Sequence, residues 1–208
     1  MAVGDGYCTL VELKERVSID DTIDDLQIIS AIGASSRWID EHCQRSFNQT
    51  TSQARVLDAG DYRTLCLGEF GDLVSVMTLK TDDNLDGVFE TTWAASDYQL
   101  LPIVAPTRPD PHPYTSIRST GTRFFPLASC VGRLGLIEVT GVWGWPAVPD
   151  AVHEACLIQS ARVFKRRHSP EGVTGWQSEF GPIRVSARAD PDVEALLAPY
   201  RRTVVLVA

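Results

Sequence analysis

The first fifty residues carry apolar positions three and four apart, the spacing of helices packed on one face. Thr9 and Glu12 form the Thr-x-x-Glu signature of a capping box, and Leu10, Leu13 and Val17 follow on one face. They predict a short helix over residues 9–17. The start signal Asp20-Asp21-Thr22 then precedes a longer stripe, which predicts a helix over about residues 23–45; its apolar positions are Leu26, Ile28, Ile29, Ile32, Ile39 and Cys43.

The pattern changes after a polar linker at residues 48–53. Short runs rich in β-branched and aromatic residues predict strands at 54–57, 64–67, 74–80, 88–93 and 135–141. Between the third and fourth runs, residues 82–87 have the composition of a hairpin turn. Five prolines between residues 102 and 113 predict an extended loop without a regular element.

Helical features return after the aromatic turn Trp143-Gly144-Trp145-Pro146. Pro149 suits the first turn of a helix, and a broad apolar surface runs from Val152 to Phe164 before the basic residues 165–168. Residues 182–186 predict a short strand. Asp190-Pro191 then starts a last helix, whose apolar positions are Val193, Leu196 and Leu197.

The order of these elements predicts an α+β protein. We expect a small helical bundle built from the N- and C-terminal helices, with an inserted antiparallel β domain. The predicted division is an N-terminal helical part at residues 1–51, a β-rich insertion at 52–145, and a C-terminal helical part with an extended tail at 146–208.

Composition fits an ordinary globular protein, with 44% hydrophobic and 22% charged residues. The net charge of -8 argues against a sequence-independent grip on DNA, which needs clustered Lys and Arg. Five scattered cysteines indicate reduced thiols rather than a disulfide framework. No apolar run reaches the length of a membrane span, so we expect a soluble protein made in the cytoplasm.

Two patterns raise the question of a metal site. Asp82, Asn84, Asp86 and Glu90 occupy positions one, three, five and nine of a calcium loop, but position twelve is Trp93 instead of the bidentate Glu. We therefore favour a hairpin turn, with calcium binding as the alternative. His153 and Cys156 are three apart on one helix, a spacing that can present two zinc ligands, but no second pair accompanies them. We predict no metal.

Patterns for catalysis are missing. The chain has no Gly-x-Ser-x-Gly elbow, no cysteine in a family-specific catalytic setting and no glycine-rich phosphate loop. We predict no catalytic residues, no enzyme activity and no cofactor. The basic residues 165–168 are interpreted as the favourable charges at a helix C-terminus, with contact to nucleic-acid phosphate as the alternative. The Trp143–Trp145 segment is interpreted as a packed turn, with a stacking platform as the alternative.

Three stretches resemble the head–tail connector (adaptor) family of tailed phages, which includes the adaptor of gene transfer agents. The first is Tyr7-Cys8-Thr9-Leu10 together with the helix that ends in Arg37-Trp38-Ile39-Asp40 and Phe47. The second is Gly144-Trp145-Pro146-x-Val148-Pro149 and the helix it opens. The third runs from Phe180-Gly181-Pro182-Ile183-Arg184-Val185 to Pro199-Tyr200-Arg201-Arg202. The resemblance rests on the order of these three stretches along the chain. The residues of the β-rich middle contribute little to it.

The resemblance implies a virion protein of the neck, at the head–tail junction. It implies a ring of twelve subunits that docks beneath the portal protein and supports a head-closure (stopper) or tail-terminator protein, with DNA passing through the channel without sequence-specific contact. It also implies that the C-terminal segment contacts the portal or a neighbouring subunit. The candidate interface residues are Trp176, Phe180, Ile183, Arg184, Val185, Tyr200, Arg201 and Arg202.

Several alternatives stay open. The strand-like residues 179–189 add an edge to a partner's sheet or pair with the inserted β domain, and the residues do not choose between these. The first alternative to an adaptor is another neck or tail protein, either a head-closure stopper or a tail terminator. The second is a small phage-encoded enzyme. The β insertion has no assigned role.

Overall fold

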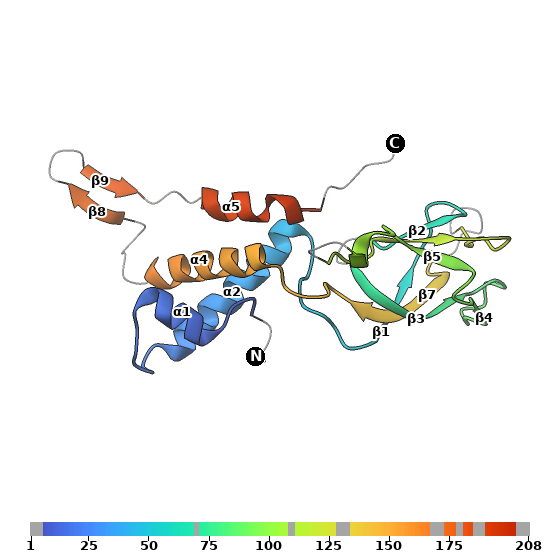
Figure 1. Ribbon diagram of the computed structural model, residues 1–208, viewed down its shortest axis with the longest axis horizontal. Helices are drawn as coiled ribbons and strands as arrows, with labels where there is room; N and C mark the ends of the chain where they lie inside the picture. Colours follow the sequence, from blue (N-terminus) through green and yellow to red (C-terminus); the bar gives the residue numbers. More distant parts are fainter. Residues whose placement is uncertain are drawn as a thin grey trace. The chain divides into compact units, whose positions relative to one another are not determined.

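The chain folds into an α+β protein (Figure 1). The computed structural model describes residues 6–68, 71–107, 111–127, 134–166, 173–177, 181–184 and 190–202. Its contacts divide the chain into two compact units. The helical unit comprises Met1–Gln44 and Val148–Ala208, and the β unit comprises Arg45–Ala147.

The helical unit is built on two long helices, α2 (Asp25–Cys43) and α4 (Asp150–Arg166), which pack against each other. The buried positions along α2 include Ala31, Ser35 and Ser36, and those along α4 include Ala155, Ser160 and Ala161. Because these side chains are small, the two backbones can approach closely. The shorter α1 (Leu10–Val17) contacts both long helices, and α5 (Pro191–Leu197) packs on α4.

The helix starts test the capping predictions. At α1 the capping box is confirmed, since the Thr9 side chain accepts from the Glu12 amide and the Glu12 carboxylate accepts from the Thr9 amide. At α2 the predicted start at Ile23 is wrong: the helix begins at Asp25, and its N-cap residue makes no side-chain cap hydrogen bond. Ile23 and Leu26 are 84% and 82% exposed, so Leu26 does not widen the buried stripe.

The β unit contains two antiparallel sheets that share one core. The first has the order β1 (Gln53–Leu57), β7 (Ile137–Trp143), β3 (Leu73–Thr81) and β4 (Thr91–Thr92). The second has the order β2 (Thr64–Cys66), β6 (Ser116–Ser119) and β5 (Tyr98–Leu101). Alternate residues of β7 are buried, as expected for a strand with one face on a core. Residues from both sheets form a single apolar cluster, which includes Leu65, Leu79, Ile117, Val139 and Trp143.

Sequence patterns located some strands and missed others. β1, β2, β3 and β7 lie within one or two residues of their predicted bounds, whereas β4 is only two residues long. β5 and β6 were not predicted because each is only four residues long and neither contains a run of β-branched residues. The proline-rich stretch contains one 3₁₀ turn, Ala105–Thr107, where no regular element was expected.

The C-terminal segment contains its own hairpin. β8 (Val173–Gln177) pairs antiparallel with β9 (Gly181–Arg184). Of the strand-like residues 179–189, the structure describes 181–184, and these pair with β8. Pairing with a partner's sheet stays a prediction. A two-stranded sheet leaves one edge of each strand without a neighbour in the hairpin.

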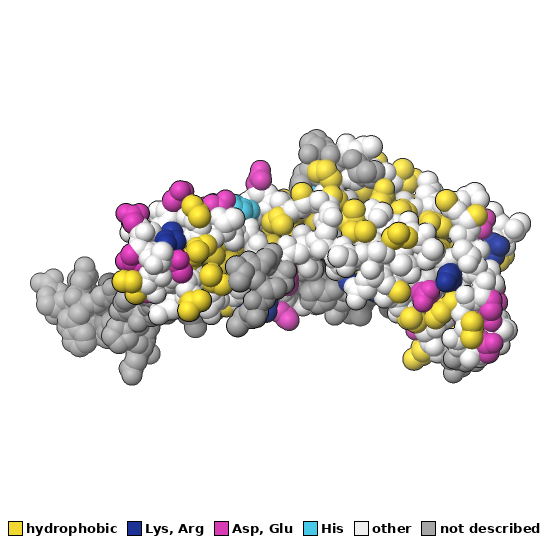
Figure 2. All heavy atoms as spheres, turned by 90° about the horizontal axis from the view of Figure 1, so that it is seen from below, with side chains coloured by type: hydrophobic (Ala, Val, Ile, Leu, Met, Phe, Trp, Pro, Cys, Tyr) yellow, Lys and Arg dark blue, Asp and Glu magenta, His cyan; other side chains and the backbone are white. Residues whose placement is uncertain are grey.

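Large apolar side chains lie exposed on both units. On the helical unit they include Val11, Ile23 and Leu26, and Figure 2 shows apolar and acidic side chains beside one another on its drawn face. On the β unit the exposed pair Tyr62 and Phe124 is in edge-to-face contact, with ring centroids 6.5 Å apart. None of the described helices has the length and apolar character needed to span a membrane.

Candidate functional site

Two segments of the β unit, residues 45–50 and 143–147, lie side by side and form what we call the junction. Thr50 N donates to the Trp143 carbonyl at 2.8 Å, and Trp143 N donates to Thr50 Oγ1 at 3.1 Å. Gln49 Nε2 donates to the Pro146 carbonyl at 2.7 Å. Gly144 has φ +107°, and a Cβ there would lie 2.0 Å from the carbonyl oxygen of Asn48. Only glycine therefore fits this close approach.

A buried carboxylate holds the junction from inside. Asp72 is 1% exposed, and its Oδ1 lies 2.9 Å from Arg45 Nη1. Its Oδ2 accepts from Trp145 Nε1 at 3.1 Å, while its backbone carbonyl accepts from Gly144 N at 2.8 Å. The Trp145 ring also contacts Phe47, with centroids 5.1 Å apart. Residues 45–51, which sequence patterns placed with the N-terminal helices, thus contact the β unit.

The aromatic turn is packed. Trp143 and Trp145 are 0% and 1% exposed, so neither ring is available as a stacking platform in this fold. Trp143 Nε1 donates to the Gln53 carbonyl at 2.9 Å, and the Arg55 guanidinium lies 4.3 Å from its ring centroid. The packed-turn interpretation is the one that the structure supports.

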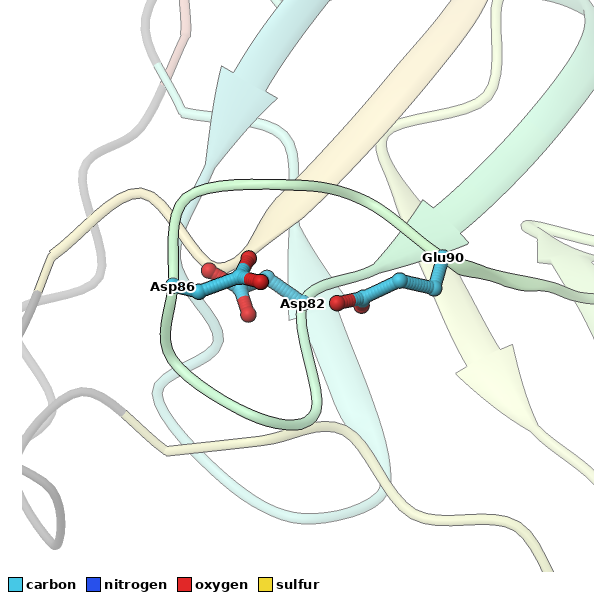
Figure 3. Close-up of side chains that lie close together, drawn as sticks. All are labelled: Asp82, Asp86 and Glu90. Carbon is cyan, nitrogen blue, oxygen red and sulfur yellow. The ribbon is translucent and has the colours of Figure 1, made fainter.

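The residues of the calcium-loop pattern form the connection between β3 and β4 (Figure 3). Asp82 is buried, and its two carboxylate oxygens accept from Leu85 N at 2.7 Å and Gly87 N at 2.8 Å. One carboxylate oxygen from each of Asp82, Asp86 and Glu90 lies within 4.8 Å of the others. The predicted hairpin connection is present. The hydrogen bonds from the Leu85 and Gly87 amides to the Asp82 carboxylate stabilise the loop without a bound ion. The calcium-loop spacing of Asp82, Asp86 and Glu90 in the sequence already indicated that these three carboxylates could lie close together.

The calcium alternative lacks its strongest ligand. Trp93, at the twelfth position of the pattern, is buried and stacks on Phe125 with ring centroids 4.6 Å apart. Its Nε1 donates to Thr81 Oγ1 at 3.2 Å, so the position serves the core of the β unit. A bidentate carboxylate at this position completes a calcium loop of that type, and this chain has none there.

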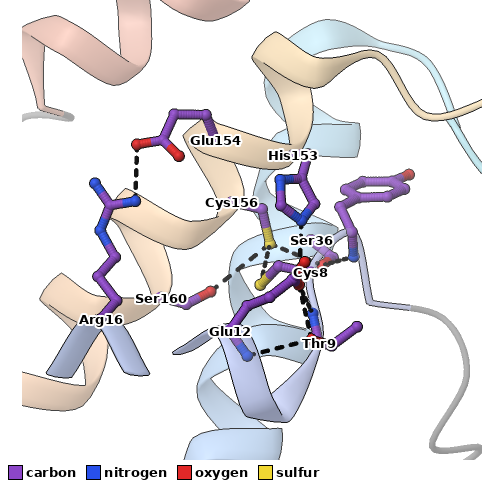
Figure 4. Close-up of polar contacts among 10 residues, drawn as sticks. Cys8, Thr9, Glu12, Arg16, Ser36, His153, Glu154, Cys156 and Ser160 are labelled. Atoms are coloured by element: carbon purple, nitrogen blue, oxygen red, sulfur yellow. Dashed lines mark hydrogen bonds and ion pairs between the residues drawn. The ribbon is translucent and has the colours of Figure 1, made fainter. Parts of the chain in front are cut away.

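The segment before α1 is fastened to the long helices (Figure 4). Tyr7 N donates to Ser36 Oγ at 3.1 Å, and the Tyr7 hydroxyl donates to the carboxylate of Asp40. Burial raises the pKa of Asp40 to about 6, against the lowering effect of the Tyr7 hydrogen bond. Cys8 follows directly, and its Sγ lies 3.5 Å from Sγ of Cys156 on α4.

His153 and Cys156 do not converge on a metal position, although they share a helix. His153 Nε2 lies 3.2 Å from Glu12 Oε2, while the Cys156 thiol contacts Cys8 and two serine hydroxyls. Hydrogen bonds from the Thr9 amide, the Thr9 hydroxyl and His153 lower the pKa of Glu12 to about 2. The histidine therefore supports the α1 capping box, and the zinc alternative has no geometric basis among the described residues.

The candidate interface residues separate into two groups. Trp176 lies in β8 opposite Pro182, and Ile183 lies in β9 opposite Gly175, with Arg184 at the end of β9. Phe180 and Val185 lie outside the described residues.

The second group follows α5. Tyr200 ends a 3₁₀ turn (Ala198–Tyr200) and is half-buried, while Arg201 is exposed. Arg202 N donates to the Cys43 carbonyl at 3.0 Å, so this part of the chain is fixed to the end of α2. Burial, together with the positive charge of Arg201, lowers the pKa of His42 nearby. Of the basic cluster, Lys165 and Arg166 are exposed in the last turn of α4, and residues 167 and 168 lie outside the description.

The fold of this chain is similar to that of chains in three solved structures. No protein-family model matches the chain, and no curated protein matches its sequence. A chain in the neck of an empty gene transfer agent (GTA) particle, computed with C6 symmetry, has a TM-score of 0.61 at 18% identity, covering 100% of this chain and 96% of that one. A chain in the neck of the native particle, computed with C12 symmetry, has a TM-score of 0.58 at 19% identity with the same coverage.

A third structure, the virion of the native GTA particle, contains a chain that matches with a TM-score of 0.54 at 20% identity. That match covers 96% of this chain and 91% of the other. The chain thus has the α+β fold of components of the GTA neck and virion, over nearly its whole length. The resemblance expected from the three sequence stretches is confirmed at the level of the fold.

Proposed function

We propose that the protein is a structural subunit of the virion neck, a head–tail adaptor (connector) without enzyme activity. The observation that carries this proposal is a fold likeness over the full chain to components of GTA necks. Both units take part in the match, so the likeness includes the β unit as well as the helices. The ordered N-terminal, Trp-Pro and C-terminal resemblances point the same way.

In this proposal the subunits form a ring beneath the portal protein, with twelve members. The matched neck structures were computed with C6 and C12 symmetry, which agrees with a ring. Exposed Val11, Ile23 and Leu26 on the helical unit support subunit contacts there, since buried apolar area drives such association. The net charge of -8 suits a channel through which DNA slides without being held.

The C-terminal segment is the proposed contact to the portal or to a neighbouring subunit. A hairpin whose outer edges have no partner strand among the described residues is suited to extending a partner's sheet, because main-chain hydrogen bonds supply affinity without a large apolar core. Arg201, exposed directly after the 3₁₀ turn Ala198–Tyr200, is suited to an acidic partner surface. The β unit faces outward or towards the head-closure or tail-terminator protein.

The test is recruitment to portal-bearing heads that lack necks. Purified protein should bind such heads and form a ring visible by electron microscopy, with the portal vertex as the position of the added density. Binding only to tails, or to heads already carrying another neck ring, would identify the protein as a tail terminator or a head-closure stopper. Failure to associate with heads or tails would remove the basis of the proposal.

The role of the hairpin has a separate test. Replacing residues 173–184 by a Gly/Ser linker of equal length should abolish recruitment, because the strand edges are lost. The control is Met77→Ala, which removes a side chain 63% exposed on the β unit and should bind heads normally. Full recruitment of the hairpin-less variant would show that the contact lies elsewhere.

A further inference from the structure

The helical unit contains two thiols in contact, and the fold gives them no structural task beyond filling the core. Cys8 Sγ and Cys156 Sγ are 3.5 Å apart although the residues are 148 positions apart in sequence (Figure 4). Cys156 is 0% exposed and Cys8 is 6% exposed. Of the other described cysteines, Cys43 is buried in α2 and Cys66 is exposed in β2.

We propose that Cys8 and Cys156 form a disulfide under mild oxidation by a peroxide, which ties the segment before α1 to helix α4. A disulfide requires sulfur atoms about 2 Å apart, so the two side chains must approach by roughly 1.5 Å. Cys8 precedes the capping residue Thr9, whose backbone is extended (φ −92°, ψ 159°), and is not itself part of a helix. A small shift of this segment brings the sulfurs together without disturbing α4.

The surroundings of Cys156 favour its thiolate. Besides the Cys8 thiol, the hydroxyls of Ser36 and Ser160 lie 3.5 Å and 3.7 Å from its sulfur. The hydrogen bond from Cys8 lowers the pKa of Cys156 to about 6, against the raising effect of burial. The same hydrogen bond, with burial, raises the pKa of Cys8. One thiol of the pair is thus the nucleophile and the other keeps its proton, which is the arrangement of an attacking and a resolving cysteine.

The reaction balances with hydrogen peroxide as the oxidant. The Cys156 thiolate attacks one peroxide oxygen and becomes a sulfenic acid, and the departing hydroxide takes a proton from solvent to become water. The Cys8 sulfur then displaces hydroxide from the sulfenic sulfur, and the Cys8 proton converts that hydroxide into a second water. Two thiols lose two electrons and peroxide gains them. The small size of peroxide matters because both thiols are buried.

The consequence is a covalent clamp on the helical unit. The closed loop would contain α1, α2 and the entire β unit, and cross-links across long loops restrict the unfolded chain most. Only the usefulness of the clamp rests on the proposed function, since a virion passes from a reducing cell interior to an oxidising exterior. Formation of the disulfide does not depend on that role.

The experiment uses the full-length reduced protein with about one equivalent of hydrogen peroxide, followed by alkylation in denaturant and non-reducing peptide mapping. We expect a mass loss of about 2 Da, a peptide pair joined through Cys8 and Cys156, and a Tm rise on the order of 5–10 °C that a phosphine reductant reverses. Recovery of both residues as alkylated thiols, or linkage of either to another cysteine, overturns the proposal.

Matched variants sharpen the result. In Cys8→Ser the sulfenic acid at Cys156 has no resolving thiol and should be trapped by dimedone. Cys43→Ser removes another buried thiol and should leave the Cys8–Cys156 link unchanged. Peptide mapping of the unmodified protein decides by itself whether the Cys8–Cys156 disulfide forms. The test therefore does not depend on whether every variant folds.

Discussion

Asp72 is the residue whose loss should damage the β unit most. Its carboxylate is buried and serves both Arg45 and Trp145. In Asp72→Ala the guanidinium of Arg45, whose side chain is 16% exposed, loses its counter-charge, and Trp145 Nε1 loses its acceptor. Breaking a buried ion pair by removing one partner costs about 3–5 kcal/mol, because the remaining charge stays desolvated. We therefore expect the free energy of unfolding of the β unit to fall by about this amount.

A double-mutant cycle separates the ion pair from simple packing. Arg45→Met removes the charge but keeps most of the stem, and Asp72→Asn keeps an acceptor for Trp145. The double variant should be destabilised by less than the sum of the single variants, with a coupling of at least about 1 kcal/mol. Glu138→Gln is the control, since the Lys80–Glu138 pair is 3.8 Å long and partly exposed and should contribute under about 1 kcal/mol.

The assay is equilibrium unfolding in urea followed by tryptophan fluorescence. Three of the five tryptophans report on the β unit, namely Trp93, Trp143 and Trp145. Circular dichroism at helical wavelengths follows the helical unit in the same samples. A loss below about 1 kcal/mol for Asp72→Ala, or strict additivity in the cycle, would refute the claim that this carboxylate holds the junction together.

Three further predictions concern single positions. Gly144→Ala places a Cβ 2.0 Å from the Asn48 carbonyl at φ +107° and should lower the Tm of the β unit sharply, on the order of 10 °C or more, measured by calorimetry. Burial raises the pKa of Asp40 above its unfolded value, so stability should fall as pH rises from about 4 to 6, and Asp40→Asn should remove this fall in Tm-versus-pH scans. Thr9→Ala should cost about 1 kcal/mol at neutral pH in urea unfolding. That difference should shrink as pH falls below about 4, because protonation of Glu12, whose pKa is lowered to about 2, weakens the capping box even in the unmodified protein.

The two-unit arrangement bears on the proposed role. An adaptor must contact the portal, its own neighbours and the next neck protein, and separate units offer separate surfaces for these contacts. The β unit has its own core and its own closed junction, so changes on its surface need not disturb the helices. Loss of head binding and loss of tail attachment should therefore be separable by mutation, with hairpin variants affecting the first and β-unit surface variants the second.

Local patterns predicted the helical unit well. The capping box at Thr9 and Glu12 and the start of α5 depend on contacts within one or two turns, so spacing alone reveals them. The start of α2 was misplaced because Ile23 and Leu26 fit an apolar stripe yet lie exposed. An apolar side chain at an interaction surface looks the same in sequence as one in a core.

Local sequence patterns predicted only some of the strands. β3 and β7 are nine and seven residues long and rich in β-branched residues, so their patterns were found. β5 and β6 have only four residues each, which is too short for a recognisable alternation. The same holds for the sites. The spacing of Asp82, Asp86 and Glu90 was visible in sequence, but that two amides already occupy the Asp82 carboxylate required the folded loop.

By itself, the sequence determined the α+β class, the order of helices around a β insertion and the resemblance to neck adaptors. The class and the order of elements follow from periodicity, capping and turn chemistry, which act over a few residues. The resemblance rests instead on three sequence stretches and their order along the chain. Only the tertiary structure brought Asp72 against Arg45 and Trp145, and Cys8 against Cys156. The physical reason is that such contacts join residues tens to more than a hundred positions apart, whose meeting depends on the tertiary packing inside each unit and not on any local preference.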